Sequence, residues 1–162
     1  MDYPVLLTGQ EVIALRLMLR ITTNIGLQNK IEALFKAADF YMTSPQSKEE
    51  KDVFAKEATT TARRSLIDIL DTNMALDFPL FSALVKNPNG TTVVNLSEGP
   101  FRALQTVARE TYTLRAEPTE NERNLHGVIQ VNQPAILAAF ELAEENVNRT
   151  PKPTQPPANG AN

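Results

Sequence analysis

Two pairs of arginines are the residues of this sequence best suited to bind an anion. Arg16 and Arg20 lie one helical turn apart in a segment, residues 10–23, whose other side chains are nearly all apolar, while Arg63 and Arg64 follow three consecutive threonines. A guanidinium in a dry environment usually binds a carboxylate or phosphate through two parallel hydrogen bonds. All four arginines are therefore candidate ligand or interface residues. For Arg16 and Arg20 the alternative is a snorkelling pair or an interfacial ion pair. For Arg63 and Arg64 it is a solvated helix face, with Asp68 as the ion-pair partner of Arg64.

Catalytic and metal-binding chemistry has little support. The sequence has no cysteine and one histidine, His126, which excludes disulfides, thiolate catalysis and a pair of histidine metal ligands within one chain. His126 precedes Gly127 at an expected helix end, where capping or packing is a simpler role than general-base catalysis. The sequence has no Gly-rich phosphate loop, Walker pattern or G-x-S-x-G motif. We therefore predict no catalytic residue, no metal, no cofactor and no enzymatic activity.

Charge and hydropathy narrow the classes of partner and compartment. The chain has 16 basic and 19 acidic residues, so its net charge is −3, and the basic residues are scattered among the acids. Binding to nucleic acid usually needs a concentrated positive surface, so nucleic acid is an unlikely partner. No apolar run reaches the roughly 18 residues of a membrane span, and the N-terminal residues lack the positive charge of a secretory signal. We therefore expect a cytoplasmic protein, in the host cytoplasm or the virion if its source is a virus.

The first half of the chain predicts helices. Thr8 and Glu11 form a capping box before an apolar helix over residues 10–23. A helix stop at 24–26 and a second helix over 27–42 predict an αα-hairpin. A long helix then begins either at Ser44-Pro45 or at Ser47, whose capping partner would be Glu50, and ends near residue 71.

The second half predicts shorter elements. Phe78-Pro79 should interrupt any helix, and residues 80–86 are expected to form a short one. The β-branched residues 91–96 predict a strand, followed by a helix over 97–114 and a short helix ending at Gly127. Residues 128–131 predict a second strand, and Asn132 should cap a final helix that contains Pro134.

Two further features concern domain organisation. Each of the segments 4–43 and 92–131 reads as a strand followed by two helices, which suggests a duplicated unit. The alternative is that capping chemistry makes all strand-to-helix junctions look alike. We expect one helical domain over residues 1–149, followed by a disordered proline-rich tail over 150–162.

Taken together, these patterns predict a mainly α protein. We expect a compact bundle of five to six helices built on αα-hairpins, with at most a small β patch of two or three strands. A helix that is apolar on most sides is either central in its own domain or buried in an oligomer, and residues 10–23 therefore favour a non-catalytic interaction or assembly protein. It would self-associate or dock on a larger complex, as viral or phage accessory and structural proteins do. The alternatives are a binder of an anionic metabolite or nucleotide, using arginines between helices, and a weak nucleic-acid-associated regulator.

Overall fold

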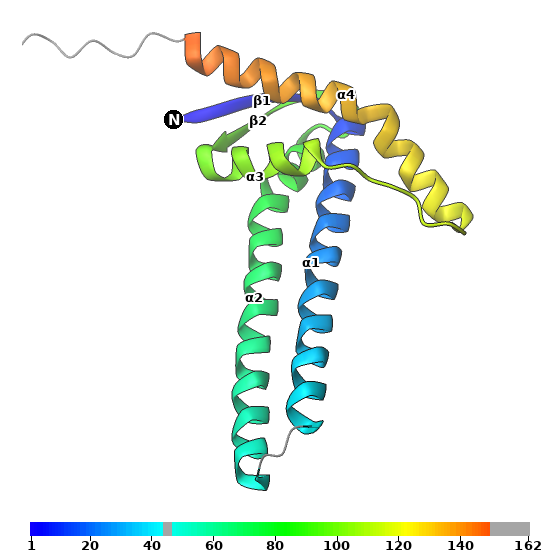
Figure 1. Cartoon of the computed structure of the whole chain (residues 1–162). Coiled ribbons are helices and arrows are strands. Elements are labelled where there is room, and N and C mark those ends of the chain that lie inside the picture. The colour runs from blue at the N-terminus through cyan, green and yellow to red at the C-terminus, as the bar shows by residue number, and fades with distance from the viewer. Residues whose placement is uncertain (44–46, 150–162) are drawn as a thin grey trace, which may run out of the picture.

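The computed structural model describes residues 1–43 and 47–149, and these form four helices and two strands (Figure 1). In chain order the elements are β1 (Asp2–Thr8), α1 (Gly9–Thr43), α2 (Lys48–Lys86), β2 (Thr91–Ser97), α3 (Glu98–Arg109) and α4 (Glu120–Arg149). The described part is mainly helical with a small sheet, as the sequence predicts, but it has fewer helices than the expected five to six. The tail expected over 150–162 lies outside the described residues, as does the alternative helix start at Ser44-Pro45.

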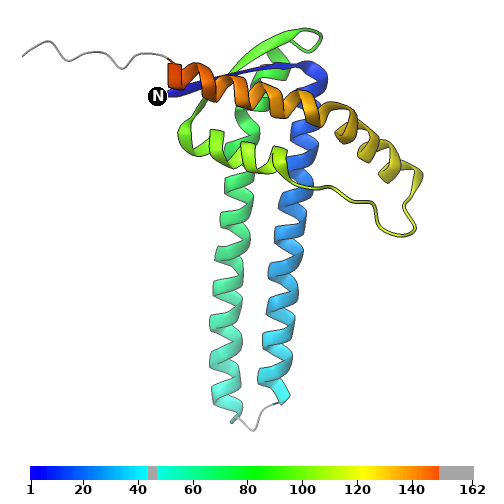
Figure 2. The ribbon, with the colours of Figure 1, turned by 45° about the horizontal axis from the view of Figure 1, so that its top comes forward.

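The described part of the chain has a head and a projecting hairpin. The head contains β1, β2, α3, α4 and the adjoining ends of α1 and α2, while the rest of α1 and α2 extends away from it as two antiparallel rods (Figures 1 and 2). Asn73 Nδ2 donates to Thr23 Oγ1 at 2.8 Å, and farther out the rings of Tyr41 and Phe54 stack with centroids 3.8 Å apart. The αα-hairpin of this protein is therefore formed by α1 and α2, not by residues 10–23 and 27–42.

β1 and β2 pair antiparallel over seven residues each, from Asp2 opposite Ser97 to Thr8 opposite Thr91. Alternate side chains of β1 are buried, namely Tyr3, Val5 and Leu7, as strand geometry requires when one face of a sheet covers a core. The strand expected over 91–96 is confirmed, and its partner is the N-terminal segment of the same chain.

The core lies in the head, and α1 supplies its central face. Val12, Ala14, Leu15, Met18 and Leu19 are buried there, at most 3% exposed. They pack with buried side chains of both strands and of α2, α3 and α4. The apolar coat of residues 10–23 is therefore largely covered within one chain. This segment is therefore central in its own domain, the first of the two alternatives, and α3, α4 and the sheet cover it in place of a second chain.

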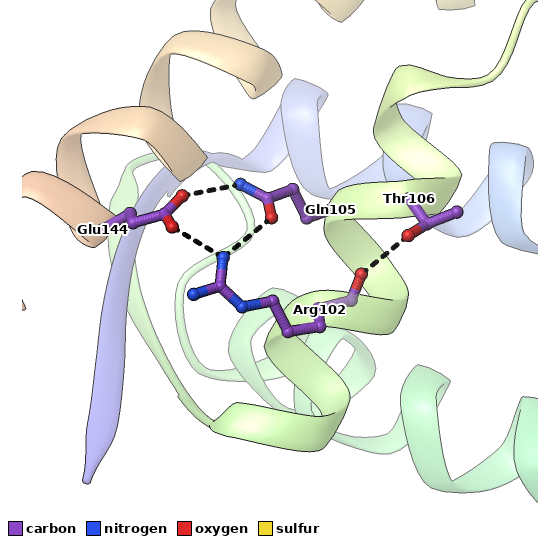
Figure 3. A network of polar contacts seen from close by, with 4 residues as sticks. All are labelled: Arg102, Gln105, Thr106 and Glu144. Atoms are coloured by element: carbon purple, nitrogen blue, oxygen red, sulfur yellow. Dashed lines mark hydrogen bonds and ion pairs between the residues drawn. The ribbon is translucent and has the colours of Figure 1, made fainter.

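Polar contacts join α3 to α4 at the edge of this core (Figure 3). Arg102 donates to Glu144 at 2.7 Å and to Gln105 at 3.2 Å, and Gln105 donates to the other carboxylate oxygen of Glu144 at 3.1 Å. The hydrogen bonds from Arg102, and then that from Gln105, lower the pKa of Glu144. The side chain of Gln105 is buried, so these bonds also satisfy its polar atoms.

Two helix starts follow the predicted capping chemistry. The backbone N–H of Thr8 donates to Glu11 at 2.8 Å, and the N–H of Glu11 donates to the Thr8 hydroxyl at 3.3 Å. The N–H of Glu50 donates to the Ser47 hydroxyl at 3.2 Å, so α2 begins in the Ser47 register. Both capping boxes are confirmed as helix starts.

Two predicted interruptions of α1 and α2 are wrong. α1 continues through residues 24–26, where Gly26 has a negative φ, and the facing α2 stabilises the longer helix. α2 continues from Lys48 to Lys86 through Pro79. Proline removes the hydrogen bond to the carbonyl of the residue four positions earlier, which is Ala75. Ala75 is exposed, so water can satisfy that carbonyl.

The C-terminal region also has a longer helix than the sequence predicts. α4 runs unbroken from Glu120 to Arg149, so Gly127 does not end a helix and residues 128–131 are not a strand. Pro134 has no N–H to donate to the carbonyl of Gln130, and Gln130 is exposed. α3 ends at Arg109, earlier than the expected residue 114, and the chain crosses to α4 without helix or strand. Within α4 the side chain of Ile129 is buried against the core, which favours helix over strand there.

Candidate interaction surface

The head-proximal half of α2 has two apolar faces. One face contributes Leu76, Leu80 and Ala83 to the core. The opposite face has six large apolar side chains, each between 47% and 71% exposed: Ile67, Leu70, Met74, Phe78, Phe81 and Val85. These six residues are named the α2 stripe. A helix that packs on one side only is expected to be polar on the other, so the stripe is a surface that a single copy leaves uncovered.

The spacing of the stripe matches a straight helix. Ile67, Leu70 and Met74 are followed eleven residues later by Phe78, Phe81 and Val85. Eleven residues complete close to three turns at 3.6 residues per turn, so the second set lies almost directly above the first. The stripe is therefore one narrow, continuous band along about five turns of α2.

Arg16 from α1 fixes one edge of the stripe. Its guanidinium donates to both carboxylate oxygens of Asp77, at 2.7 and 3.0 Å, and lies 5.1 Å from the ring centroid of Phe81. The hydrogen bonds to Asp77 raise the pKa of Arg16 further, although partial burial opposes this. A bidentate pair of this kind restrains both side chains. Arg16 therefore links α1 to α2 through Asp77, and its guanidinium packs against Phe81 at the edge of the stripe.

Charged side chains lie along the other edge of the stripe. At 100° per residue, Arg64, Asp68, Asp71 and Lys86 fall on the same flank, and all four are exposed. The flank begins with a basic residue, continues with two acidic residues and ends with a basic one. The two acidic residues therefore lie beside the N-terminal half of the stripe, and Lys86 lies at its C-terminal end.

The structure does not bring the four predicted site arginines together. Arg16 is paired with Asp77, and Arg20 is exposed beside it, at a cavity of about 260 Å³ that Asn73 also lines. Arg63 and Arg64 lie at the far end of the stripe, and Arg64 is thirteen residues before Asp77 in α2, or about 20 Å at 1.5 Å per residue. The two pairs therefore cannot hold one ligand between them.

A larger cavity, of about 530 Å³, lies between α1, the segment that joins α3 to α4, and α4. His126 is inside α4 rather than at a helix end, and its Nε2 lies 2.8 Å from the carbonyl oxygen of Tyr112. The Tyr112 hydroxyl donates to the carbonyl of Val107 at 2.8 Å and lies 3.2 Å from the Thr22 hydroxyl, while burial raises its pKa. These contacts hold the connecting segment against the head.

Sequence reasoning missed the α2 stripe although its signal is present in the sequence. The expected helix end near residue 71 and the expected interruption at Pro79 divided the six residues among separate elements. Read as one helix, positions 67, 70, 74, 78, 81 and 85 show the three- and four-residue spacing of an apolar face.

Among the described residues, no cluster of three or more histidine, cysteine, aspartate or glutamate side chains has the arrangement of a metal site. No helix in the same part of the chain is long and apolar enough to span a membrane. No protein family, curated protein or solved structure matches this chain.

Proposed function

We propose that this chain is a non-catalytic interaction or assembly protein that binds a protein partner through the α2 stripe. The observation that carries the proposal is the second apolar face of α2, on the side opposite its core-facing residues. Monomeric proteins seldom leave such a band in water, and contiguous apolar patches of this kind commonly mark protein–protein contacts.

The setting of the stripe supports this function. The hairpin projects from the head, so a partner can approach along α2 without displacing the core (Figures 1 and 2). Aromatic residues and methionine are enriched at the centres of protein interfaces, and the central members of the stripe are Met74, Phe78 and Phe81. The expected compartment is the cytoplasm, or the virion if the source is a virus, in keeping with a chain that has no cysteine.

The two alternative functions have weaker support. A binder of anionic metabolites would need several free guanidinium groups at one site, but the carboxylate of Asp77 occupies Arg16 beside Arg20, and Arg63 and Arg64 lie far from both. A nucleic-acid regulator would need a basic surface, but Asp68 and Asp71 interrupt the basic residues beside the stripe.

Site-specific photocrosslinking in the cell that makes the protein tests the proposal. p-Benzoylphenylalanine replaces Phe78 in one variant and Val131 in a control, because Val131 is 79% exposed on α4 and outside the stripe. After irradiation we expect the Phe78 variant to form a covalent adduct with a protein, and the Val131 variant to form little. The proposal is wrong if neither variant forms an adduct, or if both form the same ones in equal amount.

A further inference from the structure

We propose that the partner of the α2 stripe is a second copy of this chain, packed antiparallel so that the two α2 helices cover each other. This inference rests on the proposed function and specifies the partner. It follows from the area of the stripe, from the spacing of its residues and from the charges along its flank.

The exposed area of the stripe is close to the area that one partner buries in a standard protein–protein interface. Six side chains that are each about half to two-thirds exposed offer on the order of 700 Å², since one aromatic side chain accounts for roughly 150–250 Å² when buried. A standard interface buries roughly 800 Å² per partner, whereas the largest apolar patch of a typical monomer is roughly 300–600 Å². The stripe with its flanks therefore matches half of a dimer interface.

The flanking charges are complementary when the helices run antiparallel. On this flank Asp68 and Lys86 lie eighteen residues apart, and neither belongs to an ion pair found among the described residues. In a twofold antiparallel pair each flank faces the same flank of the second copy. Asp68 can then lie level with Lys86 of the second copy, and the symmetry repeats this ion pair at the other end. In a parallel twofold pair each flank faces the opposite edge of the second copy's stripe, where Arg16 already binds Asp77. Asp68 and Lys86 would then not meet.

The same register interleaves the apolar side chains. When Asp68 is level with Lys86 of the second copy, the twofold axis passes at residue 77. Phe78 of the second copy then falls between Met74 and Phe78, and each of its other stripe residues falls between two positions of the first copy or, for its Ile67, just beyond Val85. Side chains that alternate in this way pack as ridges into grooves. One alignment of the two helices therefore gives both the ion pairs and the interleaved apolar side chains.

The position of the head favours the same orientation. The head lies at one end of the hairpin, next to the C-terminal end of the stripe (Figure 1). An antiparallel pair places the two heads at opposite ends of the interface. Each head then lies beside the hairpin of the other copy. A parallel pair would bring both heads to the same end and make them compete for space.

Light scattering and sedimentation on the full-length protein test self-association. We expect a concentration-dependent dimer, which Phe78→Glu weakens by roughly 30-fold or more, as substitution at the centre of an interface does. Phe35→Glu is the matched control, because Phe35 is 72% exposed on α1 and Phe78 is 71% exposed. Far-ultraviolet circular dichroism establishes that both variants are folded. A wild-type monomer at all concentrations up to several hundred micromolar, or equal weakening by both substitutions, would overturn the inference.

Charge exchange tests the orientation. Asp68→Lys and Lys86→Asp should each weaken the dimer, because each places like charges together twice. The double variant Asp68→Lys, Lys86→Asp should recover most of the wild-type affinity. A dimer in which the double variant is no stronger than either single variant would overturn the antiparallel register.

The crosslinking experiment separates this inference from the proposed function. An adduct of the Phe78 variant with the mass of two chains supports both. An adduct that contains a different protein, together with a monomeric purified chain, overturns the second copy as partner and leaves the proposed function in place. The absence of any adduct overturns both.

Discussion

Gly9 lies where β1 passes directly into α1, and the chain packs closely around it. Its N–H donates to the carbonyl of Gly90 at 3.1 Å, and a Cβ added at Gly9 would collide with the backbone carbonyl of Pro88. The turn between α2 and β2 thus fits against the start of α1 because residue 9 has no side chain. Gly99 is the second residue of α3, just after β2, and its surroundings are open.

Gly9→Ala is therefore expected to destabilise the protein, by about 1–3 kcal/mol, because backbone atoms rather than a flexible side chain must move. Chemical denaturation with circular dichroism measures the change. Gly99→Ala is the control, since no heavy atom lies within 4 Å of the added Cβ. Equal stability of the Gly9→Ala variant and the wild type would contradict the close packing at this junction.

Glu144 is expected to make the contact between α3 and α4 depend on pH. Hydrogen bonds from Arg102 and then Gln105 lower its pKa below the ordinary value of 4.5. The charged carboxylate therefore stabilises the folded state above pH 4.5, and this stabilisation is lost as the pH falls through the lower pKa of the folded protein.

Glu144→Gln removes the charge and nearly preserves the shape. We expect this variant to unfold at a lower urea concentration than the wild type at pH 7 and to differ less from it at pH 3. Glu145→Gln is the comparison, because the ion pair that Glu145 forms in the described part of the chain is with Arg149 of its own helix, at 3.3 Å. A gap between Glu144→Gln and wild type that is the same at both pH values would show that the charge of Glu144 does not contribute.

At the scale of elements, the long helices carry residues that local rules assign to helix ends. The helix starts predicted from the capping boxes at Thr8 and Ser47 are confirmed, since hydrogen bonds form there between residues three apart in sequence. The predicted helix ends at Gly26 and Gly127 were wrong: a glycine that ends a helix commonly takes a positive φ, and neither residue does. Packing between elements determined the continuation of these helices.

Replacing those two glycines tests helix continuity directly. Gly26→Ala and Gly127→Ala should each stabilise the protein by roughly 0.5–1 kcal/mol, because alanine loses less conformational entropy in a helix. No heavy atom lies within 4 Å of either added Cβ. Urea denaturation gives the values. Destabilisation by Gly26→Ala would indicate a turn at 24–26 instead of a continuous α1.

At the scale of the molecule, the hydrophobic core and the projecting hairpin are separate parts of the structure. Every fully buried apolar side chain in the described part of the chain lies before residue 20 or after residue 75, so the core is a property of the head. The distal hairpin depends on contacts between two helices alone. The head is therefore expected to fold without the distal hairpin.

Shortening the hairpin tests this division. Deleting residues 31–65 and joining the ends with a short glycine-rich turn removes facing lengths of α1 and α2 and keeps the bond between Thr23 and Asn73. We expect cooperative thermal unfolding with a Tm within about 5 °C of the wild type, a shift equivalent to roughly 1 kcal/mol. Loss of cooperative unfolding would show that the distal hairpin belongs to the folding unit. The deletion also retains all six stripe residues, so we expect it to remain competent to dimerise.

The sequence by itself determined the helical character of the chain, the strand at 91–96, two helix starts and the candidate arginines, because these depend on interactions between near neighbours in sequence. The pairing of β1 with β2, the burial of residues 10–23, the continuity of α1, α2 and α4, and the pairing of Arg16 with Asp77 were decided by the tertiary structure. Each of these depends on residues that are distant in sequence and that only folding brings together. The α2 stripe depends on both. Its three- and four-residue spacing is a property of the sequence, but its exposure depends on which side of α2 the head covers.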